Sequence, residues 1–549
     1  MRGALPRLLF AAAALPFLPA LFARFVDWDD PVFIVKNELL KGFDLPAMFF
    51  FVYGGHYHPL SWLSMKLDRV IFGPGPFGPH LINILLHAAS AVVLLQVARR
   101  LLGDDEDAVW PAAFAALLFA VHPLRAESVA WATERRDCLS GLFYLLTIRC
   151  WLEDRAQPAL AWFVVSLLSK GIGVTLPLAL ALIDTACRGR RLDAAWAKKV
   201  APFAAAALVF GVVGLRAQRG NGANLTLAAF SLSSRAAVAA YGLCFYPFKT
   251  LLPVSLIPLY PLPKPLPTLS QYPYGPCAAL VAALTVFLWH QRRRYPRVAA
   301  GALFYAATVG PVVGVFHFGP QLVADRYSYL PCLPLALFGG AALRRGLADP
   351  ARRRLAAAAA GALVVALAGL TVRQVAFWHD GVTLWERELS VRRDVPLAHH
   401  YLAEIALSHG NTAEAERRER DALAVDRAYA PALNGLGLAL SAQGRAAEAD
   451  AAYRAALAAK PDYWEPASNL GLSLARQHRF EEASLSFQRA LHLEPANAGV
   501  HANFGLALLT AGDRARGAAE LETALRLDPN QPKIAAIRAS LNNGVRPRN

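Results

Sequence analysis

The chain has 549 residues, of which 56% are hydrophobic and only 17% are charged, and its mean hydropathy is +0.33. Soluble domains carry about 25% charged residues, so the composition excludes a disordered chain and argues against a soluble enzyme. Lys and Arg number 56 against 40 for Asp and Glu, a net charge of +16. In a membrane protein such an excess indicates basic cytoplasmic loops and contacts with anionic headgroups or phosphates, rather than with nucleic acid. The sequence therefore predicts an integral membrane protein.

Long hydrophobic runs fill the chain from Leu5 to Phe377, and each span needs about 20 apolar residues, or fewer inside a bundle. The candidate spans are residues 5–25, 80–101, 110–124, 138–153, 158–172, 173–187, 199–215, 275–291, 298–317, 328–343 and 355–376. If these segments alternate across the membrane, every basic cluster falls on the cytoplasmic side. Those clusters are Arg2 with Arg7, 99–100, 188–199, 292–297 and 344–354. We expect a helical membrane domain over residues 1–385 with its N-terminus in the cytoplasm, and 235–262 as an interfacial or re-entrant segment.

The last third of the chain is charged, rich in Ala and repetitive. Pro461, Pro495 and Pro529 are 34 residues apart, and so are Gly437, Gly471 and Gly505. This period is typical of tetratricopeptide repeats, which stack helix pairs into a solenoid that binds peptides. The spacing predicts four repeats over residues 396–531, at 396–429, 430–463, 464–497 and 498–531, and a capping helix and tail over 532–549. An odd number of spans places this solenoid on the extracytoplasmic side.

The first external loop opens with Asp27-Trp28-Asp29-Asp30-Pro31. Mutual repulsion among these carboxylates raises the pKa of one of them, which then suits a general base toward an acceptor hydroxyl. Two other interpretations remain open: Asp27 and Asp29 hold a divalent cation between them, or the segment is a solvated turn.

Several cations interrupt the pattern of positive charge inside, because they fall in the predicted external loops. They are Lys36, Lys41, Arg125, Arg135, Arg136 and Arg326. As a group they favour the phosphate of a lipid-linked donor, whereas each one singly is better explained by a headgroup or by a neighbouring carboxylate. His56, His58, His80 and His87 lack the spacing and the additional ligands of a metal site, so no metal site is predicted from them.

Several segments together resemble a known family. They are WDDPVFIVKNELLKG, YHPLSW, GPHLINILLHA, LLFAVHPLRAESVAWATERRDCLSGLFYLLT, LLSKGIGVTLPLALALID, GPQLVADRYSYLP and WHDGVTLWERELSV, followed by the repeats. This combination is similar to the transmembrane and tetratricopeptide-repeat-containing O-mannosyltransferases and their bacterial relatives, within the GT-C glycosyltransferases. The resemblance implies an all-α fold, with a polytopic bundle of about 11 helices before the solenoid. It also implies inverting transfer of mannose or another hexose from a polyprenyl-phosphate carrier.

The resemblance also implies roles for individual residues. Asp29 is expected as the base and Asp30 as its partner, or the reverse. The residues expected to bind the donor and its phosphate are Arg125, Glu127, Glu134, Arg135, Asp325 and Arg326. A phosphate is already a good leaving group, so no cofactor or metal is required in principle. The residues that bind the acceptor are not predicted.

The sequence is compatible with three functions. The first is transfer of a sugar to Ser or Thr of exported proteins at the outer face of a bacterial inner membrane, because the excess of Ala, Arg and Leu suggests a GC-rich bacterial genome. The second is a ligase or polymerase of envelope glycans, or a transferase that modifies glycolipid. The third is a non-catalytic membrane scaffold. They differ in where the sugar is found and in whether Asp29 is required.

Overall fold

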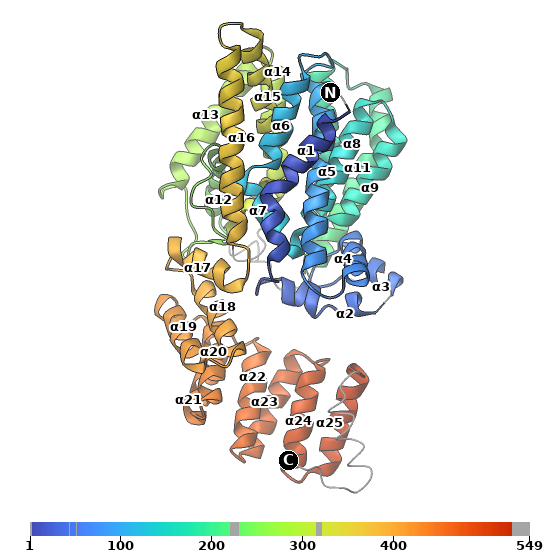
Figure 1. Cartoon of the computed structure of the whole chain (residues 1–549). Coiled ribbons are helices and arrows are strands. Elements are labelled where there is room, and N and C mark those ends of the chain that lie inside the picture. The colour runs from blue at the N-terminus through green and yellow to red at the C-terminus, as the bar shows by residue number, and fades with distance from the viewer. Residues whose placement is uncertain (1–2, 43, 51, 220–229, 314–320, 530–549) are drawn as a thin grey trace. The chain divides into compact units, whose positions relative to one another are not determined.

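The computed structural model describes residues 3–42, 44–50, 52–219, 230–313 and 321–529, and it divides the chain into two compact units, Met1–Arg387 and Glu388–Asn549 (Figure 1). The first unit is helical, apart from one small sheet of two strands in its described part. The second unit consists of paired helices. The capping helix predicted over 532–549 lies outside the described residues.

The first unit is a bundle of helices of unequal length. Its α-helices are α1 (Leu5–Ala14), α2 (Glu38–Lys41), α3 (Leu45–Phe50), α4 (Pro59–Phe72), α5 (Phe77–Leu102), α6 (Val109–Ala120), α7 (Ala126–Ala130), α8 (Arg135–Leu152), α9 (Ala156–Ser169), α10 (Leu176–Leu182), α11 (Ala194–Arg219), α12 (Leu232–Leu251), α13 (Tyr274–Gln291), α14 (Pro296–Val309), α15 (Leu333–Ala348), α16 (Arg353–Ala376) and α17 (Gly381–Val391), the last of which continues into the second unit. Strands β1 (Tyr260–Pro261) and β2 (Gln321–Val323) are antiparallel, with Tyr260 opposite Val323.

Proline residues divide several of the hydrophobic runs. The 3₁₀-helix η1 (Leu15–Phe22) continues α1 and contains Pro16 and Pro19, which cannot donate the backbone hydrogen bonds of a regular α-helix. Helix α6 ends before Pro123, and the chain turns by 53° there. The described residues contain four helices long and apolar enough to cross a membrane, or five if the bent pair around Pro123 is one span. The count of eleven spans therefore stays a prediction.

Small residues bring the central helices together. Ala88, Ala91 and Ala98 of α5 are buried in the same apolar core as Ala112 and Ala116 of α6. Residues of this size let helix backbones approach closely inside a bundle. Helix α15 approaches the same region at Gly340, where an added Cβ atom would lie 2.7 Å from the carbonyl oxygen of Pro111.

The basic clusters meet at one end of this bundle. The carboxylates that follow α5 and α8 join basic residues from other helices. The ion pairs are Arg100–Glu153 at 2.7 Å, Arg188–Asp154 at 2.6 Å, Lys199–Asp154 at 3.4 Å and Arg344–Asp105 at 2.5 Å. The C-terminal ends of α5, α8 and α15 therefore share one end of the bundle, and the N-terminal ends of α5 and α8 lie at the other.

The second unit contains four helix pairs. They are α18 (Pro396–Ser408) with α19 (Thr412–Val425), α20 (Ala430–Ala442) with α21 (Ala446–Ala459), α22 (Trp464–Arg476) with α23 (Phe480–Leu493), and α24 (Ala498–Thr510) with α25 (Arg514–Leu527). The pairs start 34 residues apart. A glycine in the first helix of a pair makes room for a large side chain of the second: a Cβ atom on Gly471 would lie 3.0 Å from the ring of Phe487, and one on Gly505 would lie 2.9 Å from Leu521.

Candidate active site

A cavity of about 400 Å³ lies beside the loop that contains Asp29 and Asp30. The residues that line it are Trp28, Asp29, Gly54, Gly55, His56, Tyr57, His58, Trp131, Arg136, Leu167, Lys170, Gly171, Ile172, Phe210, Gly214, Ala217, Pro311, Val312, Gln321, Arg326 and Tyr327. Trp28 stacks on Trp131 with ring centroids 4.9 Å apart, and Trp131 stacks on Trp378 at 5.4 Å. These rings hold the loop of Asp29 against the segment that leads into α8.

The two neighbouring carboxylates of the first loop have different surroundings. Asp29 lines the cavity with 31% of its side chain exposed, and its Oδ2 lies 3.9 Å from Nη2 of Arg136. Burial raises the pKa of Asp29, an effect that Arg136 partly opposes. Asp30 is 1% exposed and accepts hydrogen bonds from the backbone nitrogens of Val26 and Thr133, each at 3.0 Å. Burial raises the pKa of Asp30 to about 7. Asp29 therefore faces the cavity, whereas Asp30 is bonded to the backbone at Val26 and Thr133.

Glu134 links three cations behind the cavity wall. It is fully buried and accepts hydrogen bonds from Arg136 at 2.6 Å and from Lys170 at 3.0 Å, and its Oε1 lies 3.6 Å from Nε of Arg326. Burial opposes its charge, but Arg136 and Lys170 outweigh that effect and hold the pKa of Glu134 well below its ordinary value. The carboxylate therefore stays ionised and fixes the positions of the three cations.

Arg326 also binds Glu127. Its guanidinium forms an ion pair with that carboxylate, and its backbone nitrogen donates to Glu127 Oε2 at 2.8 Å. The guanidinium lies over the rings of Trp131 and Tyr327, 5.5 and 5.0 Å from their centroids. Among the charged residues that line the cavity are thus three cations, Arg136, Lys170 and Arg326, and one carboxylate, Asp29. Each of these cations is also paired with a carboxylate behind the wall; Lys170, for example, donates to Asp137 at 2.6 Å. What the wall offers an anion is therefore their remaining N–H donors, with one carboxylate facing them.

Of the six expected donor-binding residues only Arg326 lines this cavity. Asp325 and Arg135, like Glu127 and Glu134, lie behind its wall. Asp325 is 3% exposed and accepts a hydrogen bond at 3.0 Å from the hydroxyl of Tyr260 in β1. Arg135 is fully buried and donates to Asp68 at 2.6 Å, to Asn83, and to the carbonyl oxygen of Pro79 at 2.9 Å. Neither residue lines the cavity. Successive residues of an α-helix point about 100° apart, so when Arg136 faces the cavity from the start of α8, Arg135 turns into the bundle.

Arg125 lines a different cavity, of about 610 Å³, together with His122 and apolar residues of α6, α15 and α16. Its Nη2 donates at 2.5 Å to Ser328, and its guanidinium lies 5.4 Å from the ring centroids of Phe119 and Tyr329. Ser328 follows Arg326 by two residues, so Arg125 approaches the site from the side of the second cavity.

The histidines between residues 56 and 87 lie in different places: some line the first cavity and others are buried in the bundle. His56 and His58 line the first cavity. Burial and the charge of Arg136 lower the pKa of His56 to about 3, so its ring is neutral at physiological pH. His87 is fully buried and bonds to the hydroxyl of Tyr329 at 2.8 Å. The described residues contain no group of three or more His, Cys, Asp or Glu side chains arranged to hold a metal ion; a cation between Asp27 and Asp29 remains a prediction.

Four residues that line the cavity are not among the site residues expected from the family resemblance: Arg136, Lys170, His56 and His58. In the sequence Arg136 stands out only as one of the external cations, and the two histidines lack the spacing of a metal site. The doublet Arg135-Arg136 indicates positive charge in this loop but does not reveal which of the two side chains faces the cavity. Lys170 follows the end of α9, where the chain is extended before a 3₁₀ turn. The sequence signal for Lys170 is its position: a single cation at the end of an apolar run, at the same end of the predicted span as the acidic loop.

The chain is similar to known repeat models and to several known proteins. Two models of the tetratricopeptide repeat match residues 430–463 and 474–541. The protein O-mannosyl-transferase TMTC2 of Mus musculus is 38% identical over 114 residues, which are 20% of this chain and 13% of that protein. The protein O-mannosyl-transferase F38B6.6 of Caenorhabditis elegans is 24% identical over 455 residues, which are 77% of this chain and 63% of that protein. The homologues of this chain are named protein O-mannosyl-transferases.

The chain spans less than two thirds of the length of these relatives. Among solved structures, the tetratricopeptide-repeat protein TTC0263 of Thermus thermophilus is 22% identical, covers 30% of this chain and 89% of its own, and has a TM-score of 0.28. Together, the repeat models, the apolar helices and the relatives identify a membrane protein of all-α fold with a C-terminal tetratricopeptide-repeat solenoid.

Proposed function

We propose that this protein is a GT-C glycosyltransferase that moves mannose or another hexose from a polyprenyl-phosphate carrier to Ser or Thr hydroxyls of exported proteins. The observation that carries this proposal is the cavity in which Asp29 faces Arg136, Lys170 and Arg326. One wall offers a base to a hydroxyl, and the other offers positive charge to a phosphate.

The proposed reaction is a single displacement with inversion. The acceptor hydroxyl gives its proton to Asp29 while its oxygen attacks the anomeric carbon. The bond between that carbon and the carrier phosphate breaks, and the phosphate leaves with the electron pair. The raised pKa of Asp29 makes its carboxylate a stronger base than an exposed Asp.

The three cations stabilise the charge that develops on the departing phosphate. Glu134 holds Arg136 and Lys170 in place before the substrate arrives, so little reorganisation accompanies the reaction. The neutral ring of His56 adds a hydrogen-bonding group to the same cavity without adding charge. No step of this scheme requires a metal ion.

The second cavity, at Arg125, is the proposed path of the carrier's isoprenoid chain. Apolar side chains such as Leu118, Leu335 and Leu363 form most of its walls. Arg125 is the cation at its end, and Ser328 connects it to the segment of Arg326. The isoprenoid chain of the carrier would lie against these apolar side chains, and the carrier's phosphate would reach Arg326.

The repeat unit is proposed to recruit the acceptor protein or a partner protein. A cavity of about 280 Å³ lies among α18, α19 and α20, and the polar residues His400, Glu404, Glu419 and Asn434 line it together with Tyr463. Solenoids of this kind bind extended peptides on such surfaces. The basic end of the bundle is proposed to face the cytoplasm, which places the Asp29 cavity and the repeats on the extracytoplasmic side.

Purified full-length protein in nanodiscs tests the proposal directly. With a synthetic polyprenyl-phosphate mannose and a Ser- and Thr-rich peptide, we expect a peptide mass increased by one hexose, and no product with a nucleotide-linked mannose. Product on glycolipid alone would favour the envelope-glycan reaction. Lack of any transfer with each donor would contradict the proposal.

A further inference from the structure

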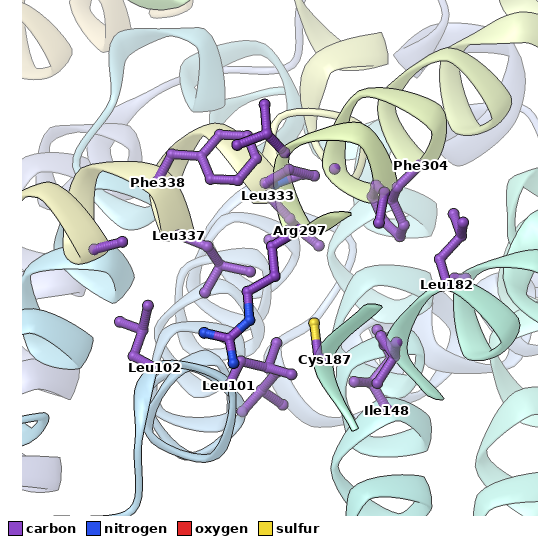
Figure 2. A pocket seen from close by; sticks show the side chains of 18 of the residues that line it. Leu101, Leu102, Ile148, Leu182, Cys187, Arg297, Phe304, Leu333, Leu337 and Phe338 are labelled. Atoms are coloured by element: carbon purple, nitrogen blue, oxygen red, sulfur yellow. The ribbon is translucent and has the colours of Figure 1, made fainter. Parts of the chain in front are cut away.

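A separate apolar cavity lies at the basic end of the bundle (Figure 2). It has a volume of about 360 Å³, within the range of about 300–1,000 Å³ that is usual for sites of small ligands. Its walls come from α5, α8, α10, α14 and α15. Leu101, Ile148, Phe304 and Leu337 are among the side chains that line it.

This cavity is distinct from the site of Asp29. Helix α8 contributes to both, with Arg136 at the first cavity and Ile148 at this one. Twelve residues separate them, which is about 18 Å along an α-helix. The hydrocarbon core of a bilayer is about 30 Å thick. With the Asp29 cavity at one membrane surface, as proposed above, a molecule bound about 18 Å further along α8 lies past the middle of the bilayer.

Two arginines, Arg297 of α14 and Arg345 of α15, line this cavity. Figure 2 shows the side chain of Arg297 extending among the apolar side chains of the cavity. In the described part of the chain, neither guanidinium has a carboxylate within ion-pair distance. Their neighbours differ: Arg344 pairs with Asp105 at 2.5 Å, and Arg188 pairs with Asp154 at 2.6 Å. Arg297 and Arg345 thus line the cavity with guanidinium groups that no described carboxylate neutralises.

We propose that this cavity binds an anionic glycerophospholipid, with one acyl chain between α5, α8 and α15 and the phosphate between Arg297 and Arg345. The lining is almost entirely apolar, which fits hydrocarbon and disfavours a peptide, since a peptide backbone would lose its hydrogen bonds there. A guanidinium offers paired donors that match the oxygens of a phosphate. Anionic lipids also gather next to clusters of basic residues at the membrane surface. The sugar carrier is the less suitable occupant, because its phosphate must reach Arg326 at the other end.

Native mass spectrometry of the purified full-length protein tests this binding, with phosphatidylglycerol and phosphatidylcholine of identical acyl chains as probes. Both lipids carry a phosphate, but the choline cation offsets its charge in phosphatidylcholine. We therefore expect one phosphatidylglycerol bound at least about tenfold more tightly than phosphatidylcholine, because only the anionic headgroup has a net attraction to the two arginines. Arg297→Gln with Arg345→Gln should remove this preference. Leu337→Trp should weaken both lipids by filling the cavity. Arg354→Gln is the matched control, because Arg354 belongs to the same basic end but does not line the cavity.

A second experiment uses only the unaltered protein, so its result does not depend on whether the variants fold. Phosphatidylglycerol with a photoreactive group in its acyl chain should label peptides that contain Ile148 or Leu337 in the unaltered protein. Equal binding of the two lipids, unchanged binding in the double variant, or labelling only outside the cavity would overturn the proposal. Displacement of bound phosphatidylglycerol by a polyprenyl phosphate at equal concentration would also overturn it, because it would assign the cavity to the carrier.

Discussion

Asp30 and Thr133 are 103 residues apart in sequence, yet the backbone nitrogen of Thr133 donates a hydrogen bond to Asp30 at 3.0 Å. Thr133 directly precedes Glu134, which holds the cations of the cavity. Asp30 therefore attaches the first loop to the segment that carries Glu134 and Arg136. Asp29 is left facing the cavity. The acidic pair thus consists of one residue proposed to react and one that positions it.

Replacing each Asp of the first loop should separate these roles. Asp29→Asn should lower turnover by about 10² or more with an unchanged melting temperature, because a general base is lost and no buried contact changes. Asp30→Asn should lower the melting temperature, since an amide cannot accept from Val26 and Thr133 as a carboxylate does. Transfer assays and thermal unfolding in detergent measure both effects.

Asp27→Asn is the matched control for charge in the same loop. Its turnover should equal that of the unaltered protein, with and without a chelator. A loss of turnover in this variant that added divalent cation restores would instead establish the cation site between Asp27 and Asp29.

The arginine doublet provides a second comparison. Arg136→Gln should lower turnover by about 10²–10³, because a donor to the leaving phosphate is removed. Its loss of stability should be smaller than that of Arg135→Gln, because Lys170 still pairs with the buried Glu134. Arg135→Gln should cost about 3–5 kcal/mol in the free energy of unfolding, since it leaves the buried carboxylate of Asp68 without its partner. Equal stability of the two variants, with equal loss of activity, would contradict the separate placement of these neighbours.

The pH profile of transfer should reveal the base. The pKa of Asp29 is raised by burial, and the residue accepts a proton only when it is ionised. Turnover should therefore fall as the pH decreases through a pKa above the ordinary value of 3.8. Residual activity of Asp29→Asn should lack this acidic limb. An identical acidic limb in the variant would assign the titration to another group.

The repeat unit contains a pH-sensitive pair. Glu419 lies 2.9 Å from His400, and burial raises the pKa of Glu419 to about 7. A raised pKa gives stability that is complete below the unfolded value of about 4.5 and is lost as the pH rises through 7. The raised pKa of His400 acts in the same direction.

Between pH 6 and 8, hydrogen exchange of α18 and α19 in the full-length protein should therefore show falling protection after correction for intrinsic rates. The slope is limited to about 1.4 kcal/mol per pH unit for one proton. Glu419→Gln should flatten it. A slope that persists in that variant would locate the titrating group elsewhere.

Periodicity and composition predict much of the fold. Because each repeat must bury the same small and large residues against its neighbours, the 34-residue spacing alone gives the starts of four helix pairs, at Pro396, Ala430, Trp464 and Ala498. The ends of the membrane helices are harder to predict, because Pro16, Pro19 and Pro123 interrupt apolar runs that hydropathy treats as continuous.

The sequence places the acidic loop in the site, but it does not distinguish Arg135 from Arg136 or reveal that Asp325 bonds to Tyr260. Those outcomes depend on helix rotation and on a contact between residues 65 positions apart. The sequence also does not show which of the neighbouring carboxylates Asp29 and Asp30 is free to face the cavity. Only the hydrogen bonds of Asp30 to Val26 and Thr133 show which carboxylate is engaged.

The most direct test of the proposed function is a glycopeptide survey of membrane and exported proteins from cells that contain the unaltered protein or Asp29→Asn, with Asp27→Asn as the control. The proposal predicts masses increased by one hexose on Ser or Thr in the unaltered and control cells, absent with Asp29→Asn. Protein masses that are the same in all three cells would contradict it. If a glycolipid then differed, the envelope-glycan reaction would replace the proposal; if none differed, the scaffold would.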